Sequence, residues 1–335
     1  MAVRNKIIKD NYGLYNADCI EVMGEMPDNK IDMAIYSPPF ASMYTYSSSD
    51  RDLGNCKNYD EFLNHYEYVV KEIFRITKPG RMTCVHCMDI PKNGDNGLVD
   101  FPGDIIRLHQ KNGFKFWDRK NIWKEPLRVA IRTRQRALMH MQVANDTLKC
   151  RGALADYLLI FKKRGDAEVP VKKPYGLIEY DGDLELMNEI EKAEYLALKE
   201  KYVNYTDDKT NRLSQFIWRR YASSAWEDIR ANRCLTYKEA RDPDDDRHVC
   251  PLQLDIVTRA VIMYTNANEI VLTPFMGIGT EVFGAVINDR RSIGIELKES
   301  YFNQAVKNIE ETKHYKDHED DLFSCVDDDI EEPDA

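Results

Sequence analysis

Two long stretches of this chain alternate short apolar runs with longer amphipathic ones, and this alternation limits the fold more than any other feature. Residues 32–36 read as a buried strand, residues 59–77 as an amphipathic helix and residues 82–87 as the next strand. Repeated strand-helix units predict an α/β fold with a doubly wound, mostly parallel sheet. The same pattern predicts strands at 13–16, 114–122, 157–161, 269–272 and 292–295, and helices at 20–26, 104–112, 251–264, 281–288 and 298–311.

Residues 166–225 break this rhythm and read as an inserted subdomain. The segment contains Pro170 and Pro174, an acidic helix-like run over 184–202 and an aromatic, basic run over 216–221. Strands and helices resume after it, so we expect one α/β domain in two halves that flank an insert and precede a tail. The expected boundaries, in chain order, are 1–165, 166–225, 226–316 and 317–335.

Charge is distributed unevenly along the chain. The net charge is −10, yet residues 317–335 hold ten acids and no Lys or Arg, so the rest of the chain is neutral. We expect this acidic tail to be disordered and solvated. Residues 115–164 carry thirteen basic residues against four acids, which predicts either a solvated helix face or a surface for nucleic-acid phosphates. The clustered arginines of this segment are Arg128, Arg132, Arg134 and Arg136.

Composition disfavours several classes of protein. No apolar run approaches membrane-spanning length, and the N-terminus lacks the apolar core of a signal peptide. The eight cysteines are mostly scattered, which favours a reducing compartment. Cys84 and Cys87 form a CxxC motif without further ligands at metal-binding spacing, so we expect them to fill a core and expect no metal. The expectation is a soluble, cytoplasmic protein.

The strand at 32–36 is followed at once by Ser37, Pro38, Pro39 and Phe40. The two prolines fix φ and remove two backbone donors, so a rigid loop holds a hydroxyl, a free carbonyl and an aromatic face together. Such a set can grip a planar ring that carries an exocyclic amine. The alternative is an ordinary strand followed by a Pro-Pro turn.

A second turn, Phe275-x-Gly277-x-Gly279-Thr280, stands between a predicted strand and the next helix. Its glycines let the backbone approach a ligand closely, and a helix N-terminus favours an electron-rich group. The next strand ends at Glu296, which is placed either to bind ribose hydroxyls or to be a plain surface acid. Together the turn and the acid predict an adenosine-containing cofactor.

The order of these motifs resembles the exocyclic-amino DNA methyltransferases that use S-adenosylmethionine, in the permuted arrangement called the beta class. The tetrapeptide at 37–40 matches the family's catalytic motif and, as in that class, precedes the cofactor glycines. The resemblance covers about residues 10–165 and 225–312 and is nearest to bacteriophage members. It implies a Rossmann-like methyltransferase sheet in which 166–225 is the target-recognition insert.

The resemblance also implies roles for single residues. Asp18 falls where the family has an acid that contacts adenine, although this aspartate would serve equally well as a helix N-cap. His248 and Pro251 fall where the family begins a helix beside the methionine end of the cofactor. In the insert, Arg219 and Arg220 are expected to contact DNA, together with the upstream arginine cluster.

The resemblance further implies S-adenosylmethionine as cofactor and double-stranded DNA as substrate, in the cytoplasm of a bacterial or phage-infected cell that modifies its DNA, as in restriction-modification. A homodimer would be in keeping with the class. The chain departs from the family at Thr273, where an aspartate near the methionine ammonium is usual. It also has Tyr36 where the cytosine-N4 enzymes usually carry threonine.

Ser37 favours cytosine N4 as the methylated atom, because aspartate or asparagine is more typical of adenine-N6 enzymes; adenine N6 is the alternative. The base would leave the duplex and stack on Phe40, without a covalent enzyme intermediate. An RNA or small-molecule methyltransferase and a catalytically silent DNA-binding module are competing interpretations. A dinucleotide-dependent oxidoreductase would not explain the tetrapeptide, and its usual third glycine is absent here.

Overall fold

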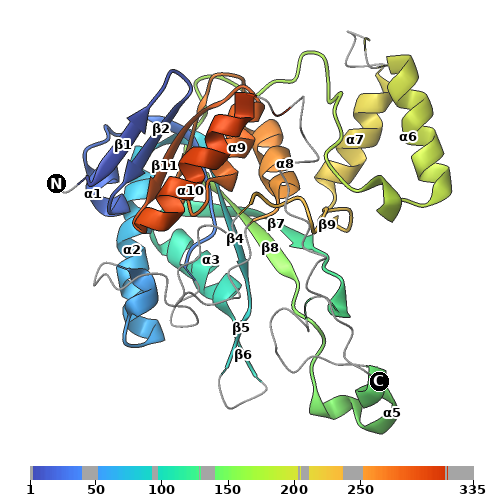
Figure 1. Cartoon of the computed structure of the whole chain (residues 1–335), viewed down its shortest axis with the longest axis horizontal. Coiled ribbons are helices and arrows are strands. Elements are labelled where there is room, and N and C mark those ends of the chain that lie inside the picture. Colours follow the sequence, from blue (N-terminus) through green and yellow to red (C-terminus); the bar gives the residue numbers. More distant parts are fainter. Residues whose placement is uncertain are drawn as a thin grey trace.

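The computed structural model describes residues 3–39, 52–92, 97–127, 129, 140–202, 204, 211–236, 252–313 and 315. In these residues the main sheet is mixed and has nine strands in the order β1-β2-β11-β10-β3-β4-β8-β7-β9 (Figure 1). Its strands are β1 (Asn5–Ile8), β2 (Tyr12–Asn16), β3 (Ile31–Tyr36), β4 (Thr77–Met88), β7 (Phe114–Ile122), β8 (Asp156–Lys163), β9 (Ala225–Trp226), β10 (Ile270–Thr273) and β11 (Arg291–Glu296). A hairpin of β5 (Ile90–Pro91) and β6 (Leu98–Val99) extends from the end of β4 (Figure 1).

The centre of the sheet is parallel. β2, β11, β10, β3 and β4 are neighbours in that order and all run in the same direction. The predicted doubly wound, mostly parallel α/β sheet is therefore confirmed, and the predicted strands are observed with ends shifted by a few residues. β1, β7 and β8 add antiparallel pairs at the two sides, which the strand pattern did not reveal because pairing direction depends on contacts between distant segments.

Helices cover both faces of this sheet, and alternate residues of β3 point into the two cores. Ala34 and Tyr36 pack under α2 (Tyr59–Ile76) and α3 (Phe101–Lys111), whereas Met33 and Ile35 pack under α8 (Leu254–Tyr264) and α9 (Thr280–Ile287). β3 is buried along its whole length, as a strand covered on both faces must be. α1 (Cys19–Gly24) packs against α2, and α10 (Glu299–Glu310) packs against β2 and α9.

The two predicted halves of the domain interleave in one sheet. β10 and β11, from the C-terminal half, lie between β2 and β3, from the N-terminal half. From the β3–β10 neighbourhood the chain continues outward in opposite directions, to β4 on one side and to β11 on the other. Open α/β sheets bind ligands at the carboxyl ends of the strands beside such a reversal. The region after β3 and β10 is therefore the expected place for a site.

A separate helical lobe lies in the segment predicted as an insert. α6 (Glu189–Tyr202) and α7 (Arg212–Ala222) stand side by side beyond α8 (Figure 1) and share an apolar cluster that includes Tyr195, Leu213 and Ile217. α7 contains the aromatic, basic run, and after it β9 returns to the sheet by pairing with β7. The described part of the chain also contains the short helix α5 (His140–Asn145) and the 3-10 turns η2 (Leu53–Asn55), η3 (Thr147–Lys149), η4 (Leu184–Leu186) and η6 (Glu311–Lys313).

Arg259 of α8 joins this lobe to the sheet domain. Its guanidinium is fully buried, donates from Nε to the Asp181 carbonyl (2.7 Å) and from one terminal nitrogen to Asp228 Oδ1 (2.8 Å). The rings of Tyr180, Tyr221 and Trp226 surround it at 4.8 to 5.5 Å. A cation in such an aromatic cage, paired with a buried carboxylate, ties the lobe to α8.

Several other predictions concern composition rather than topology. Cys84 and Cys87 lie on opposite faces of β4, each buried in a different core, where burial raises the pKa of both thiols. Among the described residues no group of three or more His, Cys, Asp or Glu could hold a metal ion. Within the same residues, no helix is long and apolar enough to span a bilayer. The acidic tail at 317–335 lies outside the described residues.

Candidate active site

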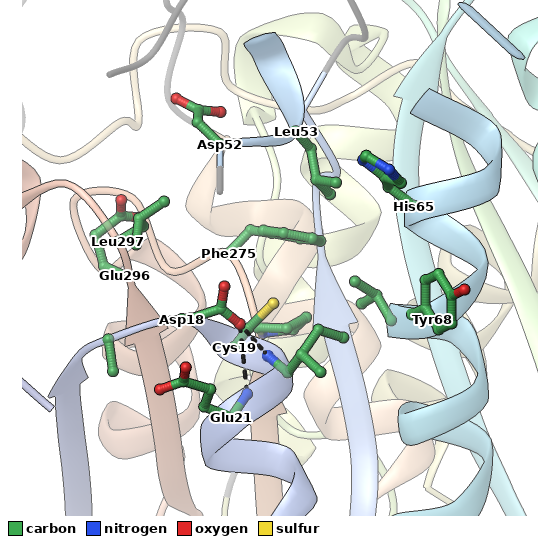
Figure 2. Close-up of a pocket in the computed structure, with 14 residues that line it drawn as sticks. Asp18, Cys19, Glu21, Asp52, Leu53, His65, Tyr68, Phe275, Glu296 and Leu297 are labelled. Atoms are coloured by element: carbon green, nitrogen blue, oxygen red, sulfur yellow. Dashed lines mark hydrogen bonds between the residues drawn. The ribbon is translucent and has the colours of Figure 1, made fainter. Parts of the chain in front are cut away.

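A pocket of about 390 Å³ opens at the carboxyl edge of the parallel strands, between α2 and the ends of β2, β10 and β11. Three predicted cofactor residues line it: Asp18 after β2, Phe275 after β10 and Glu296 at the end of β11. Figure 2 shows the Phe275 ring between Leu53 and Asp18, with Glu296 at one side. Three separate strand ends thus bring an aromatic ring and two carboxylates to one cavity.

Asp18 fulfils one of the two roles proposed for it and is placed for the other. It is the N-cap of α1, and its Oδ1 accepts hydrogen bonds from the backbone N–H groups of Ile20 (2.8 Å) and Glu21 (3.4 Å), drawn as dashed lines in Figure 2. These bonds fix the direction of the carboxylate. Because the same side chain lines the pocket, it can also accept a hydrogen bond from a ligand amine.

The two glycines of the turn after β10 both adopt a backbone conformation that other residues rarely take. Gly277 and Gly279 have φ values of 53° and 95°, in the left-handed region that favours glycine, and Gly279 caps α9, which begins at Thr280. A Cβ on Gly279 would come within 3.1 Å of Ile309, whereas one on Gly277 would meet no heavy atom within 4 Å. Gly277 therefore faces open space beside Glu296, and a ligand can approach its backbone.

Glu296 is held by backbone donors rather than by a cation. One carboxylate oxygen accepts the N–H of Gly277 (2.8 Å) and the other accepts the N–H of Lys298 (2.8 Å). Burial raises the pKa of this carboxyl to about 7 in spite of these two hydrogen bonds. A carboxylate fixed in this way keeps lone pairs for donors such as the hydroxyls of a ribose.

The pocket has a further wall that sequence reasoning missed. Asp52 and Leu53, at η2, and His65 and Tyr68, on α2, face the cofactor residues across the cavity (Figure 2). Asp52 caps η2 and accepts the N–H of Gly54 at 2.8 Å. The helix pattern at 59–77 predicted α2 but not which of its polar positions meets a pocket, because that depends on how α2 packs against α1.

Ser37 lies directly after β3, the strand that neighbours β10 in the sheet. Its Oγ donates a hydrogen bond to the His86 carbonyl on β4 (3.2 Å), so the hydroxyl hydrogen points away and the oxygen lone pairs remain available. Pro38 is buried and Pro39 is half-buried. Tyr36, one residue earlier, packs its ring 5.8 Å from that of Phe275, which links the end of β3 to the pocket.

A charged cluster supports the strand that orients Ser37. His86 Nε2 lies 3.0 Å from Asp156 Oδ2, and Lys124 pairs with the same carboxylate oxygen. Burial alone would raise the pKa of Asp156, but Lys124 and His86 hold it well below its usual range. These three residues come from β4, from the end of β7 and from the start of β8, so only the antiparallel pairing of β7 and β8 brings them together.

Glu281 is a buried carboxylate that the sequence did not single out. It lies in the first turn of α9 with 4% of its surface exposed, and its carboxyl lies near the backbone N–H of Ser37, which favours the charged form and lowers the pKa. Burial, with a smaller contribution from the nearby Glu296 carboxylate, raises its pKa to about 8. In the sequence, an acid after a glycine turn looks like an ordinary first-turn residue of a helix.

We expect these carboxyls to make the ligand-free protein less stable as the pH rises from about 6.5 to about 8. The folded-state pKa of Glu281, about 8, is above its ordinary 4.5, so in this range the folded state binds more protons than the unfolded state. Each rise in pH then favours unfolding. Buried His109, with a pKa lowered by burial to about 4, contributes below this range.

Thermal melting at a series of pH values measures this slope. Glu281→Gln should flatten the fall in melting temperature between pH 6.5 and 8, whereas Glu299→Gln, at an exposed first-turn position of α10, should leave it as in the wild type. A wild-type slope that survives Glu281→Gln unchanged would contradict the assignment.

The two arginines of the insert that are predicted to contact DNA differ in their surroundings. Arg219 of α7 is exposed, while Arg220 turns toward α6 and pairs with Glu191 at 2.7 Å, which leaves Arg219 as the freer of the two guanidinium groups. Beside Arg219, Trp218 is 54% exposed. The predicted residues that lie outside the described part of the chain are Phe40, Arg128, Arg132, Arg134, Arg136, His248 and Pro251.

Comparison with solved structures defines the class of fold. The chain is similar to the Thermus thermophilus protein TTHA0409, solved in complex with S-adenosyl-L-methionine, with a TM-score of 0.57, 19% identity, and coverage of 90% of this chain and 95% of that one. It is also similar to the PvuII DNA methyltransferase (cytosine-N4-specific), with a TM-score of 0.55, 15% identity, and coverage of 92% and 93%. The fold is therefore that of the beta-class DNA methyltransferases.

The sequence itself matches the DNA methylase family model (N6_N4_Mtase) over residues 31–307. This chain belongs to that family, whose members depend on S-adenosylmethionine, which confirms the predicted resemblance. It is 22% identical over 284 residues to the type II methyltransferase M.BamHI of Bacillus amyloliquefaciens, a match that covers 85% of this chain. The chain spans only about half of that relative, since the match covers 54% of it.

Proposed function

We propose that this chain transfers a methyl group from S-adenosylmethionine to the exocyclic amine of a base flipped out of double-stranded DNA, with cytosine N4 as the target atom. One observation carries the proposal: Ser37-Pro38-Pro39 follows β3 at the same strand edge as the glycine turn after β10 and the pocket with Asp18 and Glu296. Such a transfer needs two parts close together. One is an amine clamp, formed here by the Ser37 oxygen and the Pro38 carbonyl, and the other is a cofactor pocket at the neighbouring strand ends.

The pocket residues fit the adenosine part of this cofactor. Asp18 would accept a hydrogen bond from the adenine amine, and Glu296 would accept those of the ribose hydroxyls. Gly277, with open space where a side chain would be, would let the cofactor approach the backbone. The bound cofactor supplies an electrophilic methyl group on a sulfonium. No residue of the chain has to form a covalent bond.

Ser37 and Pro38 would prepare the amine. The lone pair of an exocyclic amine is conjugated with its ring, which makes the nitrogen a poor nucleophile. Ser37 Oγ, whose own hydrogen is given to the His86 carbonyl, and the Pro38 carbonyl would accept the two amine hydrogens and turn the lone pair toward the methyl group. Phe40 would stack on the flipped base. Catalysis is then mainly positioning and the placement of dipoles.

DNA would lie across the side of the molecule that carries the insert. Trp218 and Arg219 are adjacent exposed residues on α7, an aromatic and a cation suited to bases and phosphates. The arginines at 128, 132, 134 and 136 would add phosphate contacts from the basic segment. We propose the lobe built on α6 and α7 as the target-recognition part, within the boundaries 166–225.

Treatment of unmethylated DNA with the protein, followed by mass spectrometry of the nucleosides, tests the function. N4-methylcytosine is the expected product. N6-methyladenine would show that the protein is a DNA methyltransferase whose target is adenine and not cytosine, which is the alternative that Ser37 leaves open. Neither product, together with no binding of S-adenosylmethionine by calorimetry, would reject the function.

A further inference from the structure

Glu281 is placed between Ser37, which would hold the amine, and Glu296, which would bind the ribose of the cofactor. It belongs to the first turn of α9, directly after the glycine turn, and its carboxyl lies near enough to the backbone N–H of Ser37 for that amide to lower its pKa. Among the described residues, the groups that act on this carboxyl are the backbone amides of Ser37 and of Glu281 itself, and the carboxylate of Glu296. None of these is a cation. A buried carboxyl of this kind, beside a second carboxylate, keeps a proton near neutral pH, and a positive charge that arrives beside it would favour the ionised form.

The buried hydroxyl of Thr273 is a second, independent observation that indicates a ligand group at this place. It ends β10 with no exposed surface, and its Oγ1 has no hydrogen-bond partner among the described residues. Val271, two residues earlier, packs in the core beneath α8 and α9, so Thr273 faces the same side of the sheet, from which α9 brings Glu281. Buried hydroxyls are nearly always paired, so this one indicates a donor that a ligand would bring.

The proposed reaction determines where the positive charges of the bound cofactor must lie. S-adenosylmethionine carries two cationic groups, the sulfonium and the α-ammonium, joined by a short carbon chain. Its methyl group has to reach an amine held at Ser37, so the methionine end must lie near Ser37 while the adenosine occupies the pocket at Asp18 and Glu296. The carboxyl of Glu281 lies near the backbone amide of Ser37 and is therefore at the methionine end.

We propose that Glu281 binds the α-ammonium group of the methionine moiety, with Thr273 Oγ1 as a second acceptor. This inference rests on the proposed function and names the residue that receives the cofactor's amino-acid end. It also explains how this chain can have threonine at position 273, where the family usually has aspartate. The carboxylate would come from Glu281 on α9 instead of from the end of β10.

Glu281→Gln separates this role from a purely structural one. Glutamine keeps an oxygen that can accept the Ser37 N–H, but it removes the charge. We expect the Kd for S-adenosylmethionine to rise at least about tenfold, the loss typical of one charged hydrogen bond. The Kd for 5′-methylthioadenosine, which has the adenosine and the sulfur but no amino-acid end, should stay within about twofold. Glu299→Gln, at the exposed first turn of α10, is the matched control and should change neither value.

The calorimetry can contradict the inference and the proposed function separately. An unchanged Kd for S-adenosylmethionine in Glu281→Gln, or an equal loss for both ligands, would overturn the inference and leave the proposed function in place. A wild-type protein that binds neither ligand would reject the proposed function instead.

A second measurement uses only the wild-type protein and so remains valid if the variant does not fold. Binding of a cation requires Glu281 to be ionised, whereas burial keeps it partly protonated near neutral pH. At pH 7.5, titrations in buffers of different ionisation enthalpy should therefore show more proton release with S-adenosylmethionine than with 5′-methylthioadenosine. Glu296, the other described titratable group that acts on Glu281, meets the adenosine end and affects both ligands alike. Equal proton release would contradict the inference.

Discussion

Replacing Ser37 by alanine is expected to slow methyl transfer by about 10²- to 10³-fold, the usual cost of losing one positioned hydrogen-bonding group at a reacting centre. The oxygen of Ser37 is oriented before any substrate binds, because its hydrogen is donated to the His86 carbonyl at 3.2 Å. Alanine removes the acceptor that turns the amine lone pair toward the methyl group. Single-turnover methylation of DNA with labelled S-adenosylmethionine measures the rate, and calorimetry should find the cofactor Kd within about twofold of wild type.

Ser292 provides a matched control for this substitution. It is a buried serine of the same sheet whose Oγ also donates to a backbone carbonyl at 3.2 Å, that of Val271, but it lies near the start of β11, away from the carboxyl edge. Ser292→Ala removes a hydrogen bond of the same kind and should leave the transfer rate close to wild type. Equal rate losses in Ser37→Ala and Ser292→Ala would mean that Ser37 acts through stability alone, and full activity in Ser37→Ala would reject the amine clamp.

Phe40 extends the same test to the base. The sequence predicts that its ring stacks on the flipped base, so Phe40→Ala should weaken transfer strongly by removing a stacking contact worth about 1–3 kcal/mol. The cofactor Kd should again be nearly unchanged, because the substitution keeps every described residue that lines the adenosine pocket. A Phe40→Ala variant that methylates DNA at the wild-type rate would remove this residue from the mechanism.

The parts of the site that sequence reasoning predicted are those whose chemistry is local. Two prolines fix a loop wherever they occur, glycines at 277 and 279 permit positive φ, and an acid at a strand end is visible as such. In the structure these motifs meet at one edge of the sheet, because the parallel strands that carry them end together. The fold class followed from the same alternation of strands and helices.

The parts that were missed depend on contacts between distant segments. His86, Asp156 and Lys124 meet only because β4 pairs with β8 and β8 with β7, in antiparallel directions that the apolar pattern does not encode. Glu281 reads in the sequence as a surface acid, and only the packing of α9 on the sheet buries it against Ser37. Pairing direction and helix orientation are set by the whole core, so no local motif reports them.

Replacing Arg259 by alanine is expected to destabilise the protein by about 3–5 kcal/mol, the cost of removing one partner from a buried ion pair. The substitution leaves the Asp228 carboxylate, which is 3% exposed, without its cation and leaves the Asp181 carbonyl without its donor. It also empties the space between Tyr180, Tyr221 and Trp226. Urea unfolding followed by circular dichroism measures the change. Arg107→Ala, at an exposed arginine of α3 that pairs with Asp104, is the control and should leave the midpoint almost unchanged.

The position of Arg259 gives this substitution a functional consequence as well. The residue is on α8 of the sheet domain, whereas Tyr180 and Asp181 precede α6 in the lobe that we propose to recognise DNA. Under conditions where the variant remains folded, loosening this joint should raise the DNA concentration needed for half-maximal methylation, while the S-adenosylmethionine Kd stays near wild type, because no pocket residue is changed. Arg259→Lys keeps the charge but has one donor group in place of a fork, so it should lie between alanine and wild type in both measurements. An Arg259→Ala protein with a wild-type urea midpoint would show that the cage contributes nothing to stability, and one with an unaltered DNA requirement would show that the lobe's orientation does not govern DNA binding.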